Sequence, residues 1–141
     1  MNLDALCARF GYQVIEDVAP EGQLPKRDKA RLERTLTKGL GVLQEEGVYA
    51  FFLFLAYFAG QPENMGASEL ARRARELLKE TDPALLTCGQ DGVRGDFRAL
   101  QDLATRMDDL LLAHQLLGQM LVYARYHAKA LQESQSKGGQ P

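Results

Sequence analysis

The chain has 141 residues, of which 45% are hydrophobic and 26% charged, and its formal net charge is −2 at pH 7. This length suits one domain with its own core, and the composition is that of a soluble globular protein. The near-neutral charge excludes a chain that is basic overall, so any surface for nucleic acid must be local.

The cysteines and the N-terminus bear on the cellular compartment. Cys7 and Cys88 lie far apart without metal-ligand spacing, so we expect reduced thiols. The N-terminal run MNLDALCARF has no basic region followed by an apolar block, which argues against a signal peptide. The expected location is the cytoplasm.

The first part of the chain predicts two amphipathic helices. Residues 3–18 carry apolar side chains three and four positions apart, and a short loop with two prolines follows. Residues 26–46 form the second helix, and Gly47 is expected to cap it. Its apolar stripe consists of Leu32, Leu36, Leu40 and Leu43.

The segment 47–60, GVYAFFLFLAYFAG, has only apolar or aromatic residues between its terminal glycines. It is too short to span a membrane, which takes about 20 apolar residues. A buried strand is the alternative for so short a run, but the helical periodicity of its neighbours favours a helix. A helix that is apolar on every side needs cover from other elements, so we expect it at the centre of the bundle.

The second half of the chain predicts further helices. Ser68 suits the N-cap of a fourth helix that runs to about Glu80, and the sequence CGQDGVRG at 88–95 is typical of a loop. A heptad-like apolar pattern then continues over residues 100–131. It indicates one long helix, or two helices joined at Thr105, which could form a capping box with Asp108.

These patterns together predict an all-α, single-domain bundle of about five to six helices over residues 1–133. The central element is expected to be the apolar helix, and the C-terminal helix to be long and heptad-patterned. The tail from 134 to 141, SQSKGGQP, has nothing to bury and is expected to be disordered.

The sequence offers little for catalysis, and we expect no enzyme, no cofactor and no metal. His114 lies in the apolar seam, where a hydrogen-bonded core histidine is the simplest interpretation. His127 has no carboxylate at a spacing that would orient it as a general base. The acidic doublets at 45–46 and 108–109 diverge by about 100° on a helix, so neither converges on one point.

A row of cations on the second helix is the most distinctive arrangement. Arg27, Arg31, Arg34 and Lys38 recur every three or four residues, opposite the leucine stripe. They predict a sequence-independent contact with a phosphate backbone, with a solvated helix face as the alternative.

Two further basic groups lie elsewhere in the chain. Arg125 and Lys129 are four apart on the final helix and could extend the row. A group on the fourth helix is diluted by acidic neighbours; it comprises Arg72, Arg73, Arg75 and Lys79.

Three blocks of sequence carry a resemblance to a known family. They are ARFGYQVIEDV at 8–18, TKGLGVLQEEGVYAFFLFLA at 37–56 and LLLAHQLLGQMLVYARYHAKAL at 110–131. In their order and spacing they resemble the small helical subunit of the type III-B CRISPR (Cmr) effector complex. The chain departs from that family in having no tryptophan, with Tyr123 where one is common, and Gly39-Leu40 where a proline is common. The related small subunit of type III-A complexes therefore stays open.

The resemblance implies a non-catalytic subunit that stacks in a filament with copies of itself beside other effector subunits. Its basic surface would hold guide and target RNA through backbone contacts, in antiviral defence. Lys38 and Arg125 match basic positions of the family, whereas Arg27, Arg31, Arg34 and Lys129 extend the set by helical spacing alone.

Two other functions compete with this interpretation. One is a protein–protein adaptor without a direct RNA role, in which the apolar seam or exposed aromatic side chains dock a partner and the basic row faces acidic side chains. The other is a small bundle enzyme or ligand sensor built around His114.

Overall fold

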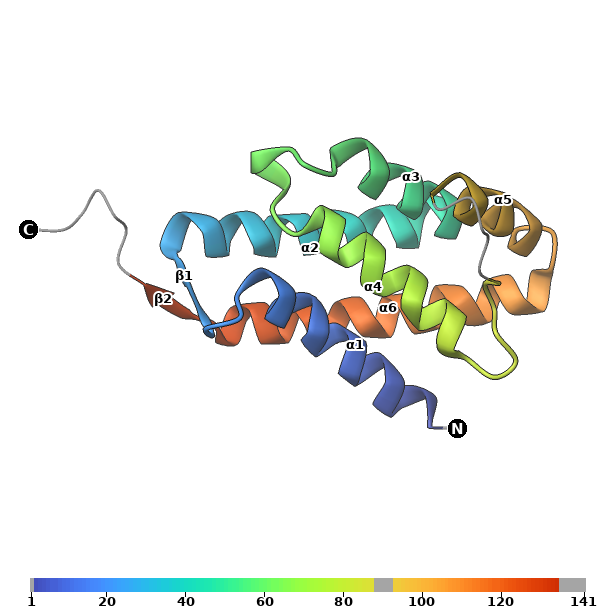
Figure 1. Cartoon of the computed structure of the whole chain (residues 1–141), viewed down its shortest axis with the longest axis horizontal. Coiled ribbons are helices and arrows are strands. Elements are labelled where there is room, and N and C mark those ends of the chain that lie inside the picture. The colour runs from blue at the N-terminus through green and yellow to red at the C-terminus, as the bar shows by residue number, and fades with distance from the viewer. Residues whose placement is uncertain (1, 88–92, 135–141) are drawn as a thin grey trace, which may run out of the picture.

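A computed structural model describes residues 2–87 and 93–134 of the chain (Figure 1). These residues form six α-helices, one 3-10 turn and two short strands, so the expected all-α bundle is confirmed. The helices are α1 (Leu3–Val18), α2 (Lys26–Glu46), α3 (Val48–Phe58), α4 (Ala67–Glu80), α5 (Val93–Leu103) and α6 (Met107–Ala130). The 3-10 turn is η1 (Pro62–Asn64), and the strands are β1 (Gln23–Pro25) and β2 (Gln132–Ser134).

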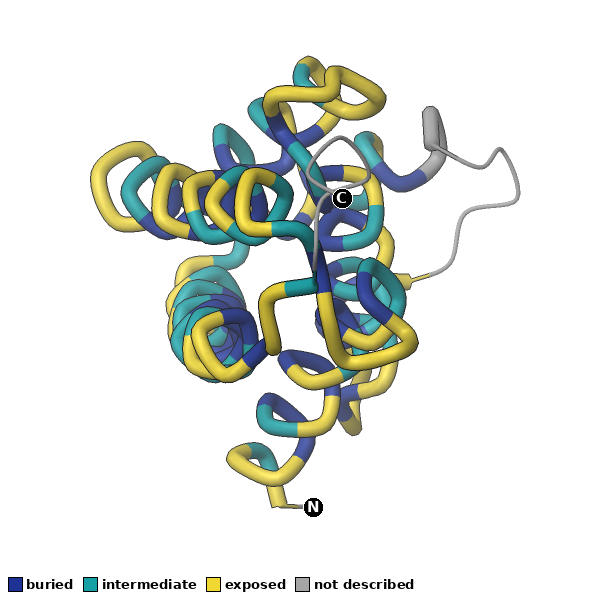
Figure 2. The backbone as a smooth tube through the Cα atoms, turned by 90° about the vertical axis from the view of Figure 1, so that its left-hand side faces the viewer, coloured by how far each residue is buried: buried dark blue, intermediate teal, exposed yellow. Residues whose placement is uncertain are grey.

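The helix α6 lies at the centre of the bundle. It packs against α1 and α2 along much of its length, and Figure 1 shows it running beside α2 across the molecule. Small side chains on its buried face, such as Ala113, Ala124 and Ala128, allow neighbouring helices to come close. Figure 2 shows the result, with buried residues on the inward sides of the helices and exposed residues outside.

The expectation of a central apolar helix at 47–60 is wrong in position, although the helix itself forms as α3. Val48, Phe51, Phe52 and Leu55 are buried, mainly against α2 and α4. The opposite side of α3 faces solvent, where Leu53 is 48% and Tyr57 74% exposed. The helix α3 thus has more apolar surface than the neighbouring helices cover.

Gly47 makes the turn between α2 and α3, as expected. Its φ of 98° lies in the region that favours glycine, and its N–H bonds the carbonyls of Val42 and Leu43 at the end of α2. Because the chain reverses there, α3 returns along α2.

The apolar seam at 100–131 is divided between two helices. The chain turns at residues 104–106, and Arg106, rather than Thr105, is the N-cap of α6. The Thr105 hydroxyl instead donates a 2.7 Å hydrogen bond to the Asp102 carbonyl. Met107, although in register with the seam, is exposed.

Three other boundaries differ from expectation. α4 begins two residues earlier than proposed, with Gly66 as its N-cap in place of Ser68. Of the expected loop at 88–95, residues 93–95 belong to α5, and residues 88–92 lie outside the described residues. β1 and β2, which no strand pattern indicated, form a parallel pair with Pro25 opposite Ser134. Beyond Ser134, the expected disordered tail lies outside the described residues.

Candidate nucleic-acid interface

The basic row of α2 is built by the amphipathic pattern of that helix. Leu32, Leu36 and Leu43 are fully buried and hold one side of α2 in the core. Since a helix places residues three and four apart on one side, the cations on the other side project away from the bundle. From Arg27 to Lys38 the row covers about 16 Å at 1.5 Å rise per residue.

The four cations of the row differ in their surroundings. Arg27, Arg34 and Lys38 are exposed and have no ion-pair partner among the described residues. The guanidinium of Arg31 is 3.6 Å from a carboxylate oxygen of Asp28, and its side chain is 30% exposed. Three cations are therefore free to meet an external anion, and Arg31 is partly neutralised.

Arg125 and Lys129 lie together on α6. With Val122 and Tyr126 they line a cavity of about 210 Å³ whose lining residues all belong to α6. The side of α2 that meets α6 is the leucine side, where Leu43 approaches Gly118. The six predicted residues thus lie on two neighbouring helices, four on α2 and two on α6.

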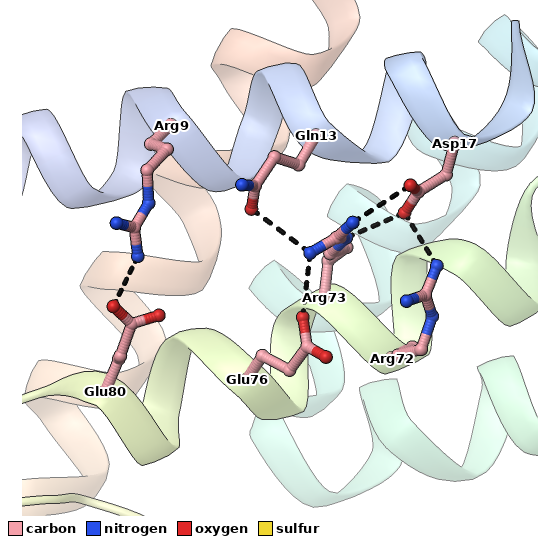
Figure 3. A network of polar contacts seen from close by, with 7 residues as sticks. All are labelled: Arg9, Gln13, Asp17, Arg72, Arg73, Glu76 and Glu80. Atoms are coloured by element: carbon pink, nitrogen blue, oxygen red, sulfur yellow. Dashed lines mark hydrogen bonds and ion pairs between the residues drawn. The ribbon is translucent and has the colours of Figure 1, made fainter. Parts of the chain in front are cut away.

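The basic side chains of α4 form ion pairs with acidic side chains of the same chain. Arg72 and Arg73 both bind Asp17 of α1, and Arg73 also reaches Gln13 and Glu76 (Figure 3). Figure 3 also shows Arg9 of α1 paired with Glu80 of α4. These ion pairs and hydrogen bonds join α4 to α1.

The other two cations of α4 face a different helix. Arg75 Nε is 3.0 Å from Asp96 Oδ2, and Lys79 Nζ is 3.0 Å from Asp96 Oδ1. Sequence reasoning missed both sets of ion pairs, because their acidic partners come from distant segments of the chain.

The histidines have local partners. The Nε2 atom of His114 lies 2.9 Å from the Leu43 carbonyl oxygen, so the partly buried, hydrogen-bonded core histidine is confirmed. The ring of His127 meets Tyr12 edge to face, with centroids 5.3 Å apart. No group of three or more His, Cys, Asp or Glu side chains suited to a metal ion occurs in residues 2–87 and 93–134.

The two acidic doublets have different surroundings. Glu45 and Glu46 are exposed at the end of α2, whereas Asp109 in the first turn of α6 pairs with Arg106. The described contacts of the two histidines are with the Leu43 carbonyl and the Tyr12 ring. Likewise, none of the described helices is long and apolar enough to cross a membrane.

Comparisons with known proteins add no relative: the sequence matches no family model, no curated protein and no solved structure.

Proposed function

We propose that the chain is a non-catalytic, RNA-contacting structural subunit of an RNA-guided effector ribonucleoprotein. Its partners would be guide and target RNA, other effector subunits and further copies of itself, as its resemblance to the type III-B small subunit implies. The RNA contact would be made through the phosphate backbone, independently of sequence.

The observation that carries this proposal is the contrast between two basic helices. On α4 the cations are paired within the bundle, whereas on α2 Arg27, Arg34 and Lys38 are exposed without described partners. Three cations on one side of a helix repel one another weakly, so an external polyanion would stabilise them. The spacing of the row is comparable to that of several backbone phosphates.

The test is charge reversal of the three free cations to glutamate in the full chain. RNA retained by the complex that copurifies with the tagged protein should fall severalfold. The dependence of log K on log salt should flatten by about 0.7 for each single-strand phosphate contact that is lost. Helix content should be unchanged, because none of the three side chains has a described contact in the core.

As a matched control, Arg98→Glu, which reverses an exposed cation of α5, is compared with Arg34→Glu, the corresponding single reversal in the row. It changes the net charge by the same amount but leaves the α2 row intact. Equal loss of RNA in both variants would mean that overall charge, and not this row, holds RNA. Unchanged retention in the α2 variant would refute the proposal.

A protein–protein adaptor is a second candidate, favoured by the exposed side of α3. Phe54 and Phe58 stack edge to face and are partly exposed beside the exposed Tyr57 and Leu53. Exposed apolar patches of this kind mark interaction sites in many proteins. If the tagged protein copurifies with one protein partner and no RNA, and Leu53→Lys abolishes that association, the adaptor function is favoured.

A further inference from the structure

An apolar hollow lies between α3, α4 and α5, and none of its lining residues belongs to the basic row. Its volume is about 260 Å³. Phe52 and Leu55 of α3 and Phe97 and Leu100 of α5 form much of its wall, and three alanines leave the space open. The volume is below the range of roughly 300–1,000 Å³ typical of sites for drug-sized ligands, so an occupant must be small.

The polar part of the wall is formed by Ser68, Arg75 and Asp96. The carboxylate of Asp96, whose side chain is only 9% exposed, lies between Arg75 and Lys79 at 3.0 Å from each. A charge buried to this extent requires such partners. The cluster of Arg75, Lys79 and Asp96 carries a net charge of +1, and two of its members, Arg75 and Asp96, line the hollow.

The geometry of the cluster leaves part of Arg75 available. Arg75 lines the hollow and pairs with Asp96 through Nε, while its side chain is 24% exposed. A guanidinium binds carboxylates best through a pair of nitrogens. The two Nη atoms of Arg75 can therefore donate hydrogen bonds to a second anion. Asp96 is poorly placed for an added cation, because two cations already lie at ion-pair distance from it.

We propose that this hollow binds a small monocarboxylate with an aromatic ring or a short branched chain. The ring or chain would fill the space between Phe52 and Phe97, and the carboxylate would pair with Arg75. The apolar wall lowers the local dielectric constant, which strengthens that ion pair relative to one in water. This site is independent of RNA binding and would be present in either function considered above.

The experiment is an NMR and calorimetric titration of the full chain with phenylacetate as the probe. Phenylacetamide and phenethylamine serve as neutral and cationic analogues of similar shape. Phenylacetate is expected to bind saturably and to shift the signals of Phe52 and Phe97. Both analogues should bind at least about tenfold more weakly, since each loses the charge-assisted contact.

Two variants, each paired with a control, locate the site. Ala56→Leu fills the hollow from an exposed position on α3 and should abolish binding, whereas Ala30→Leu, an equal change on the exposed side of α2, should not. Arg75→Gln should weaken phenylacetate about tenfold or more, and Arg72→Gln on the same helix should leave it unchanged. Circular dichroism checks that Arg75→Gln still folds, and Ala56→Leu tests the site if it does not.

Three results would overturn the proposal. They are no saturable binding of phenylacetate at millimolar concentrations, equal binding of the amide or amine, and binding that survives Ala56→Leu. RNA retention is not measured in any of these titrations, so their failure would leave the proposed function as it stands.

Discussion

Arg73 of α4 holds Asp17 of α1 with two parallel hydrogen bonds, from Nε to Oδ2 at 2.7 Å and from Nη2 to Oδ1 at 2.9 Å. The carboxylate also accepts a 2.8 Å bond from Arg72 (Figure 3). A two-pronged arginine–carboxylate contact is both strong and geometrically specific. It therefore fixes how α4 lies on α1.

We expect Asp17→Asn to lower the free energy of unfolding at pH 7 by about 1–3 kcal/mol. The hydrogen bonds from Arg73 lower the pKa of Asp17 below its ordinary value of 3.8. A lowered pKa in the folded state adds stability above the ordinary value, and that stability is lost as the pH falls below it. Denaturant titrations from pH 7 to acid should thus show a smaller pH dependence in the variant.

The control for this prediction is Glu63→Gln, which changes an exposed acid on η1. Its stability should follow that of the unaltered chain throughout the pH range. If Asp17→Asn also follows it, the contact with Arg73 adds nothing to stability.

The packing of α1 on α6 makes a second prediction. A Cβ atom at Gly11 would lie 2.9 Å from the carbonyl oxygen of Met120 and 3.1 Å from the nitrogen of Ala124. Gly11→Ala is expected to destabilise the chain by about 1–3 kcal/mol, because backbone atoms of α6 must move.

Gly41 provides the matched glycine. It lies within α2, and an added Cβ would meet nothing within 4 Å. Gly41→Ala should raise the stability by up to about 1 kcal/mol through helix propensity alone. Chemical denaturation of the two variants tests the pair, and a stabilising Gly11→Ala would contradict the close approach of α1 to α6.

The two sides of α3 should respond very differently to substitution. Phe51 is fully buried, so Phe51→Ala should cost about 3–5 kcal/mol. Leu53→Gln on the open side should change the stability by no more than about 0.5 kcal/mol. A large loss from Leu53→Gln in thermal or chemical unfolding would mean that α3 is covered on both sides.

Cys7 should be unreactive in the folded chain. It is buried, and its thiol donates a 3.4 Å hydrogen bond to the Leu116 carbonyl. Burial first, and then the charge of Asp4, raises the pKa of the thiol to about 11, so little thiolate exists at pH 8.

The measurement uses Cys88→Ser, which leaves Cys7 as the one thiol in the chain. A disulfide reagent at pH 8 should react with it only at the rate of unfolding, and rapidly once guanidinium is added. Fast reaction in native buffer would show that α1 and α6 open readily around this position.

The bounds of α1 and α2 could be predicted from the sequence because breakers and caps delimit them. Prolines and glycines separate the two apolar patterns, and Gly47 ends the second. The position of α3 could not be predicted in the same way. A helix that is apolar on every side has no sequence pattern to indicate which face meets the core. In the 11-residue helix α3, one face is buried against other helices and the opposite face is exposed.

Two features required tertiary information. The seam at 100–131 keeps its period through the turn at 104–106, because residues on both sides of the turn face the core from different helices. A helical period in the sequence shows which residues are buried, but not whether the chain keeps one direction. One long helix and two shorter helices therefore give the same sequence pattern. Similarly, the charges of Arg73 and Arg75 were visible, but Asp17 and Asp96 lie far from them in the chain.

The packing of α1 and α2 on α6 has a consequence for folding during synthesis. A ribosome makes α1 and α2 well before residues 107–130, against which both helices pack. Until then, the leucine stripe of α2 and the apolar side of α1 lack their main partner, and the contacts between them close large loops. The bundle can therefore complete its core only after α6 has emerged. Until then, the apolar faces of α1 and α2 are exposed unless another molecule binds them transiently.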